Sequence, residues 1–150
     1  MKRLNILFVC TGNTCRSPMA EAILKSKKEG WGVQSAGVYA ADGSPASEQA
    51  VQVLKEHDLI HEHISQGITP SLIDWSDKIF TMTSSHKQAL LSRFPSALEK
   101  LWTIKEFVNG SEEDVMDPYG GSVDDYRYTY QELEELIDRL VEKLSGEAGE

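Results

Sequence analysis

The segment LNILFVCTGNTCRSP, residues 4–18, places a short polar loop directly after a run of mostly apolar residues. The apolar run predicts a buried strand over residues 4–9, and the amphipathic pattern that begins at Pro18 predicts a helix. Between them, Cys10 and Arg16 are separated by five residues. Backbone N–H groups converge at a helix N-terminus and a guanidinium can close the ring, so residues 10–17 are expected to bind an oxyanion such as phosphate.

Strands and helices alternate along the rest of the chain. Apolar periodicity and turn residues predict strands at 31–38, 77–82 and 101–104, and helices from Pro18 to near Gly30, at 47–57, at 70–75, from Ser84 to Pro95 and after Ser122. Ser17 is the expected N-cap of the first helix, Ser84 that of the helix before Pro95 and Ser122 that of the last helix. Residues 108–122 are expected to form a long loop. This order predicts one α/β domain over residues 1–150, with a four-stranded parallel sheet, helices on both faces and the phosphate-binding loop after the first strand. Ligands of such sheets bind beyond the carboxyl ends of the strands, which is where Cys10 falls.

Composition limits the kinds of partner. The net charge of −9 over 150 residues argues against binding of nucleic acid, which would need a basic patch. No run approaches the ~20 apolar residues that cross a bilayer, and the first apolar run is too short for a signal peptide, so we expect a cytoplasmic protein that binds no membrane. We also expect a monomer. Cys10 and Cys15 lie in the same loop and therefore predict reactive thiols rather than a secretory disulfide framework.

The spacing of Cys10 and Arg16 changes the interpretation of both residues. Taken alone, Cys10 would more often be a small buried hydrophobic residue and Arg16 a surface charge. A thiol at a helix N-terminus that faces an arginine exists largely as thiolate, the form that attacks phosphorus. The planar guanidinium of Arg16 suits two phosphoryl oxygens and the charge that develops on them in the transition state.

Two motifs together resemble a known family. Residues 10–17, CTGNTCRS, followed by Pro18, Ala20 and Glu21, resemble the signature loop of the low-molecular-weight protein tyrosine phosphatases, and residues 117–119, Asp-Pro-Tyr, resemble that family's general-acid motif. The resemblance spans nearly the whole chain and has both motifs in the family's order and separation. It implies an enzyme that hydrolyses phosphoproteins through a cysteinyl phosphate and requires no metal and no cofactor.

The resemblance also implies roles for individual residues. Cys10 would be the nucleophile, Arg16 the phosphate clamp, and Asp117 the acid that protonates the leaving atom and then deprotonates the attacking water. By itself, Asp117 would be a turn residue, since Asp-Pro is a common loop dipeptide. The implied phosphate-binding set is the whole loop after the nucleophile: Thr11, Gly12, Asn13, Thr14, Cys15, Arg16 and Ser17.

Further positions are implied to support the loop. Ser17 would donate a hydrogen bond to the thiolate, and Asn13, Ser17, Ser35 and His63 would form a polar network that holds the loop, where asparagine tolerates a left-handed backbone. The alternative for His63 is a solvated loop histidine. The other three histidines, His57, His61 and His86, are expected at the surface, with the spacing of the first two only a weak indication of metal binding.

Cys15 has two interpretations that the sequence leaves open. It is either a packed residue behind the loop, or a redox partner that captures oxidised Cys10 as a reversible disulfide and protects the nucleophile from further oxidation.

Departures from the family pattern bear on the substrate. Tyrosine-specific members usually carry Ile or Leu where this chain has Thr14, and many have a second aromatic residue where it has Gly120, beside Tyr119. The combination is similar to the protein-arginine phosphatase branch, because a hydroxyl at Thr14 suits a polar guanidinium and Asp117 can both orient that group and protonate its nitrogen. Thr14, Asp117 and Tyr119 are therefore the expected selectivity residues.

Three alternatives remain at this point. The first is a protein-tyrosine phosphatase of the same family. The second is an arsenate reductase, which shares a similar loop but needs resolving cysteines beyond it, whereas this chain has two cysteines in all. The third is a phosphate-binding module without catalysis, which leaves the nucleophile, the clamp and the acid unexplained.

Overall fold

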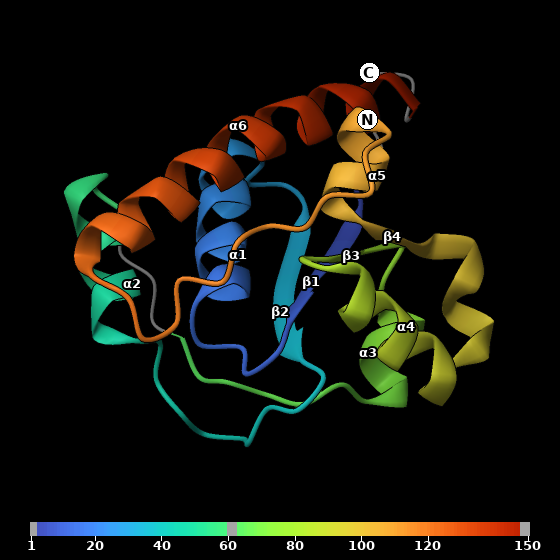
Figure 1. Cartoon of the computed structure of the whole chain (residues 1–150). Helices are drawn as coiled ribbons and strands as arrows, with labels where there is room; N and C mark the ends of the chain where they lie inside the picture. The colour runs from blue at the N-terminus through green and yellow to red at the C-terminus, as the bar shows by residue number, and fades with distance from the viewer. Residues whose placement is uncertain (1–2, 60–62, 148–150) are drawn as a thin grey trace.

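The computed structural model describes residues 3–59 and 63–147, and these contain a four-stranded parallel sheet (Figure 1). The strands are β1 Asn5–Cys10, β2 Gly32–Gly37, β3 Lys78–Thr81 and β4 Leu101–Thr103, in the spatial order β2-β1-β3-β4. All three neighbouring pairs are parallel, with Phe8 of β1 beside Ser35 of β2 and Phe80 of β3. The predicted sheet and its first parallel pair are confirmed.

Helices connect the strands and cover both faces of the sheet. They are α1 Arg16–Lys27, α2 Glu48–Glu56, α3 Pro70–Trp75, α4 Ser84–Arg93, α5 Ile104–Asn109 and α6 Val123–Glu147, with a 3₁₀ turn, η1, at Pro95–Lys100. In Figure 1 the long α6 crosses the molecule beside α1, while α3 and α4 lie on the other side of the sheet. Within the described residues, no helix combines the length and the apolar character needed to cross a membrane.

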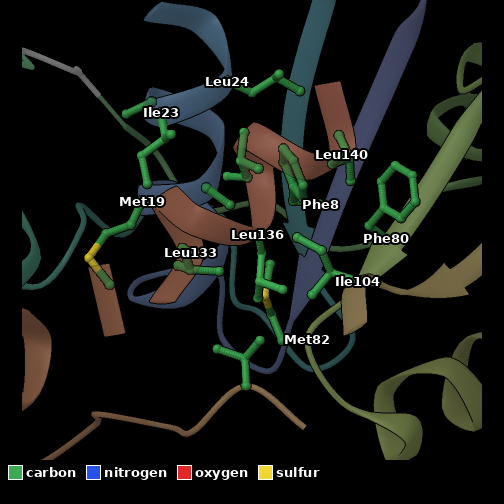
Figure 2. Packing of buried hydrophobic residues seen from close by; sticks show 14 of the residues in the cluster. Phe8, Met19, Ile23, Leu24, Phe80, Met82, Ile104, Leu133, Leu136 and Leu140 are labelled. Atoms are coloured by element: carbon green, nitrogen blue, oxygen red, sulfur yellow. The ribbon is translucent and has the colours of Figure 1, made fainter. Parts of the chain in front are cut away.

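The side chains of β1 divide between two hydrophobic layers. Ile6, Phe8 and Cys10 pack into a cluster with α1, α2, α5 and α6, whereas Leu7 and Val9 pack into a second cluster with α3 and α4. Successive side chains of a strand point to opposite faces, so a strand covered on both faces must be apolar at every position. Figure 2 shows the first layer, where side chains of α1 and α6 meet those of the sheet. This packing fixes the end of β1, and with it the position of Cys10.

Three details of the helices differ from the predictions. Ser17 is not an N-cap: α1 begins at Arg16, Cys15 occupies the cap position, and the Ser17 hydroxyl hydrogen-bonds the Cys10 side chain instead. Thr83, one residue before the predicted Ser84, caps α4 by accepting from the backbone N–H of His86. The third is α5, which was not predicted because six residues are too few to show a helical period.

The predicted starts of α2, α3 and α6 are confirmed. The side chains of Ser47 and Thr69 accept hydrogen bonds from the third residue after each of them and begin α2 and α3. Ser122 and Asp125 cap α6 reciprocally, because each side chain accepts from the other residue's backbone N–H. The long loop is also present, shortened by α5 to residues 110–122.

Candidate active site

The loop between β1 and α1 rests on the end of β2. The backbone N–H groups of Val38 and Tyr39 donate to the carbonyl oxygens of Cys10 and Thr11, both at 3.0 Å. At Gly37 a Cβ atom would lie 2.5 Å from the Thr11 oxygen, so this position requires glycine. The loop therefore lies too close to the end of β2 for any side chain at residue 37, and the two backbone hydrogen bonds hold its first residues in place.

The Cys10 sulfur lies 2.8 Å from the Ser17 hydroxyl oxygen, and the Cys10 residue is 3 % exposed. The Asn13 side-chain amide donates to the same hydroxyl oxygen over 2.8 Å. Because Ser17 already accepts from Asn13, its own hydrogen is available for the sulfur. A hydrogen bond from Ser17 can therefore stabilise a thiolate at Cys10, both as a nucleophile and as a leaving group.

Asn13 is the centre of the network that holds the loop. It is fully buried and has a left-handed backbone, with φ of 57°. Its side-chain oxygen accepts from the Gln66 backbone N–H at 3.0 Å, which fixes the amide orientation, and its nitrogen also donates to the Ser35 hydroxyl at 2.9 Å. His63 donates through Nε2 to the Asn13 carbonyl oxygen at 2.6 Å. The structure thus brings together Asn13, Ser17, Ser35 and His63, the four residues expected to support the loop.

Glu21 completes this network and was given no role from the sequence. It is buried, accepts from the Ser35 hydroxyl at 2.5 Å and from Lys25 Nζ at 2.7 Å, and lies 3.9 Å from His63 Nδ1. The signal that could have identified it is the spacing of four residues from Ser17 on α1, which places both side chains on one helix face. The Glu21 carboxyl group therefore ends the hydrogen-bond chain that begins at Cys10.

Arg16 connects the loop to the late segment that contains Asp117. Its Nη1 donates to the Val115 carbonyl oxygen at 3.0 Å, and its Nη2 lies 3.5 Å from Asp117 Oδ2. The Arg16 side chain is 4 % exposed, whereas that of Asp117 is 50 % exposed. Arg16 Nε is buried and has no hydrogen-bond partner among the described residues. A buried guanidinium with a free donor can bind an anion, and Asp117 lies where it can reach the same anion.

A cavity of about 290 Å³ opens above Cys10. It is lined by Cys10, Thr11, Gly12, Thr14, Cys15, Arg16, Asp117 and Tyr119. The Thr14 carbonyl oxygen accepts from the Ser47 backbone N–H at 2.9 Å, which ties this wall of the cavity to the start of α2. Tyr119 is 78 % exposed, and its N–H donates to Asp117 Oδ1 at 3.0 Å. The structure thus assembles the predicted nucleophile, clamp, acid and selectivity residues around one cavity.

Cys15 is a buried residue of the nucleophile's own loop and contacts α6. Its sulfur lies 3.2 Å from the Tyr126 hydroxyl and 3.8 Å from that of Ser47. Burial and the hydrogen bond with Cys15 raise the pKa of Tyr126 to about 12, so this phenol remains protonated and can donate to the sulfur. Both cysteines are free thiols.

His86 is not at the surface, contrary to the prediction. It is 5 % exposed, and its Nε2 lies 2.7 Å from the Thr11 hydroxyl oxygen. Burial and, after it, the positive charge of Arg16 lower the pKa of His86 to about 4, so the imidazole is neutral near pH 7. The expectation for His57 is confirmed, since it is exposed and stacks on Tyr130, and His61 lies outside the described residues. In the part of the chain that the structure describes, no group of three His, Cys, Asp or Glu residues could hold a metal ion.

Comparisons with known proteins agree with this geometry. The family model described as low molecular weight phosphotyrosine protein phosphatase matches residues 5–149. A protein-arginine-phosphatase of Geobacillus stearothermophilus is 52 % identical over 143 residues, which cover 95 % of this chain and 97 % of that protein. The structure of YwlE arginine phosphatase from the same organism superimposes with a TM-score of 0.93 at 51 % identity. The superposition covers 96 % of this chain and 94 % of the YwlE chain.

A second solved structure is a YwlE arginine phosphatase mutant with a phosphorylated active-site serine in place of cysteine. It superimposes with a TM-score of 0.92 at 45 % identity, and the superposition covers 95 % of this chain and 96 % of the mutant chain. With its sequence motifs, its fold and the arrangement of its site all in agreement, this chain belongs to the low molecular weight phosphotyrosine protein phosphatase family.

Proposed function

We propose that this chain is a protein-arginine phosphatase, which hydrolyses phosphoarginine residues of proteins through a cysteinyl phosphate. The observation that carries the proposal is the convergence of Cys10, Arg16 and Asp117 on one cavity whose wall includes the polar Thr14. It is supported by the similarity to proteins named as arginine phosphatases over nearly the full length of the chain.

In the first step, Cys10 attacks phosphorus. The phosphoryl oxygens are bound by the backbone N–H groups of residues 11–16 and by Arg16, whose free Nε faces no protein acceptor among the described residues. The thiolate forms the S–P bond as the P–N bond breaks, and Asp117 gives its proton to the leaving guanidinium nitrogen. The half-exposed side chain of Asp117 suits this role, because it can reach a substrate group at the mouth of the cavity.

In the second step, water hydrolyses the cysteinyl phosphate. Asp117, now ionised, takes a proton from the water as its oxygen bonds to phosphorus, and Cys10 leaves as thiolate. The Ser17 hydroxyl, whose oxygen lies 2.8 Å from the Cys10 sulfur, donates a hydrogen bond that stabilises this thiolate. The serine phosphorylated in place of cysteine in the related mutant structure supports a covalent step of this kind.

The loop-supporting residues act through the geometry of the loop. Asn13, Ser35 and His63 hold the left-handed turn and the orientation of the Ser17 hydroxyl. Their effect on turnover is therefore indirect, through the direction of the N–H groups and of the bond to Cys10.

The substrate assignment depends on the walls of the cavity. Thr14 presents a hydroxyl where an aliphatic side chain would contact a phenyl ring, and Gly120 leaves Tyr119 without a neighbouring aromatic partner. A site that hydrogen-bonds its substrate discriminates more strongly than an apolar one. Phosphotyrosine is the alternative substrate, favoured by the exposed Tyr119 at the mouth and by the description of the family model.

We further propose that Cys15 is the redox partner of Cys10. A peroxide oxidises the Cys10 thiolate to a sulfenic acid, and the Cys15 thiolate then attacks that sulfur, forms the disulfide and releases hydroxide. The position of Cys15 in the lining of the same cavity supports this role. Because the chemistry requires a reduced Cys10, we place the protein in the reducing environment of the cytoplasm, acting on phosphorylated proteins.

The experiment that tests the function is a phosphate-release assay with a phosphoarginine peptide and a matched phosphotyrosine peptide. The wild-type chain should favour phosphoarginine in kcat/KM, Cys10→Ser should abolish turnover, and Asp117→Asn should slow both substrates strongly. Full activity in Cys10→Ser would refute the mechanism, and a preference for phosphotyrosine in the wild type would refute the substrate.

A further inference from the structure

The hydrogen bond between the side chains of Thr11 and His86 has no part in the steps described above, which use only the backbone N–H of Thr11. The imidazole Nε2 of His86 lies 2.7 Å from the Thr11 hydroxyl oxygen, and the His86 residue is 5 % exposed. His86 is itself held at the start of α4, where its backbone N–H donates to the Thr83 side chain at 3.1 Å. The orientation of the Thr11 hydroxyl is therefore set by a side chain of α4.

Thr11 lies higher in the cavity than the nucleophile. Both residues line it, but Cys10 is buried whereas Thr11 is exposed. A phosphoryl group bonded to the Cys10 sulfur must lie at the floor, so the leaving group of the substrate extends past it towards the mouth. Thr11 and Thr14 both line this cavity, so each brings a hydroxyl to the walls along which the leaving group extends.

The hydrogen bond to His86 leaves the Thr11 oxygen able to accept another. The imidazole is neutral near pH 7, so Nε2 either donates to the hydroxyl or accepts from it. In the first case the oxygen keeps one lone pair, and in the second it keeps two. A guanidinium has only N–H groups to offer, so an acceptor at this place fits phosphoarginine, whereas a phenyl ring has no donor for it.

We propose that Thr11 is a second specificity-determining residue, whose hydroxyl oxygen accepts a hydrogen bond from the guanidinium of the substrate and is positioned for this by His86. The inference rests on the proposed arginine phosphatase activity and deepens it. Thr14 and Thr11 then supply two separate polar walls to one leaving group. His86 is a positioning residue, because it acts only through Thr11.

The first test is Thr11→Val, which keeps the branched shape and removes the acceptor. It should lower kcat/KM for a phosphoarginine peptide at least about tenfold, the lower end of the effect of losing one hydrogen bond to a charged group. For a phosphotyrosine peptide, kcat/KM should stay within about twofold of the wild type. Competitive inhibition by inorganic phosphate, which has no leaving group, should be unchanged. Weaker inhibition by phosphate would instead assign Thr11 to the shape of the phosphate loop and overturn the proposal.

The second test addresses His86. His86→Ala should reproduce the selective loss on phosphoarginine, and His86→Gln, whose side-chain amide can bond the hydroxyl in place of Nε2, should restore part of it. In the double variant Thr11→Val with His86→Ala, the loss should be no greater than in Thr11→Val alone, because both changes remove one interaction. Additive losses would show that His86 acts by another route and would overturn its assigned role.

Matched controls separate these effects from general damage. Thr129→Val alters a buried threonine of α6 whose hydroxyl bonds the Asp125 carbonyl oxygen, and His57→Gln alters an exposed histidine on α2. Both should keep the wild-type ratio of the two substrates. If the wild type itself fails to hydrolyse phosphoarginine, the proposed function fails; if it succeeds and Thr11→Val keeps the same ratio, only this inference fails.

Discussion

Replacing Asn13 with alanine tests the loop network most directly. The change removes side-chain hydrogen bonds to Ser17, to Ser35 and from the Gln66 N–H, each worth about 1 kcal/mol net. It also leaves alanine at a φ of 57°, where an L-residue without a local polar group costs about 1 kcal/mol more. We expect Asn13→Ala to lower the free energy of unfolding by about 4 kcal/mol in urea titrations, with an unchanged m-value.

Asn13→Gly separates the two contributions. Glycine adopts the left-handed backbone without the steric cost but cannot make the three hydrogen bonds, so about 1 kcal/mol should be recovered relative to Asn13→Ala. Both variants should also lose kcat at temperatures where they are fully folded, because the Ser17 hydroxyl is no longer held towards Cys10. Asn5→Ala is the matched control: it lies at the other end of β1, donates one side-chain hydrogen bond to the Trp75 carbonyl oxygen, and should cost about 1 kcal/mol without loss of kcat.

Two results would refute this reasoning. A loss of less than about 1 kcal/mol in both Asn13 variants would mean that the buried network does not stabilise the loop in solution. Equal stability of Asn13→Ala and Asn13→Gly would mean that the left-handed backbone imposes no cost at this position.

Three further predictions concern selectivity, pH and oxidation. Thr14→Ile should shift the ratio of kcat/KM towards phosphotyrosine by at least tenfold, and an unchanged ratio would remove Thr14 as a selector. The pKa of His86 is about 4 in the folded protein and near 6.5 in the unfolded chain, so the unfolded chain takes up a proton first as pH falls. The free energy of unfolding of the wild type should therefore decrease between pH 6.5 and 4, and in urea titrations His86→Gln should lose about 3 kcal/mol less over that range. Parallel curves of stability against pH for the two proteins would contradict this prediction. After peroxide treatment, a thiol reductant should restore wild-type activity but not that of Cys15→Ala, and equal recovery would exclude the protective disulfide.

The sheet and the loop could be predicted because their signals are local. A strand covered on both faces must be apolar at successive positions. Cys10 and Arg16 lie in one short loop, so their spacing can be seen directly in the sequence. The predicted Ser17 cap was wrong for a reason that the same stretch could not reveal. A serine at a helix start usually accepts from the helix, but here Asn13 and the Cys10 sulfur compete successfully for its hydroxyl.

The burial of His86 could not be predicted from the residues around it in the sequence. Nothing in the segment TSSHKQ, residues 83–88, distinguishes a buried histidine from an exposed one. Its burial follows from the docking of α4 against Thr11, a contact between residues 75 positions apart. The same holds for the Val115 carbonyl oxygen, since a backbone acceptor for Arg16 leaves no mark in the amino-acid sequence.

The tie between Arg16 and the segment around Val115 has a consequence for protein synthesis. The two residues are 99 positions apart, so a growing chain carries the thiol and the clamp long before it carries the acid. At about 5–20 residues per second, the ribosome needs roughly 5–20 s to add the intervening stretch. During that interval the nascent chain can expose a reactive cysteine but cannot turn over substrate, and a product truncated before residue 115 keeps that thiol without ever becoming an enzyme.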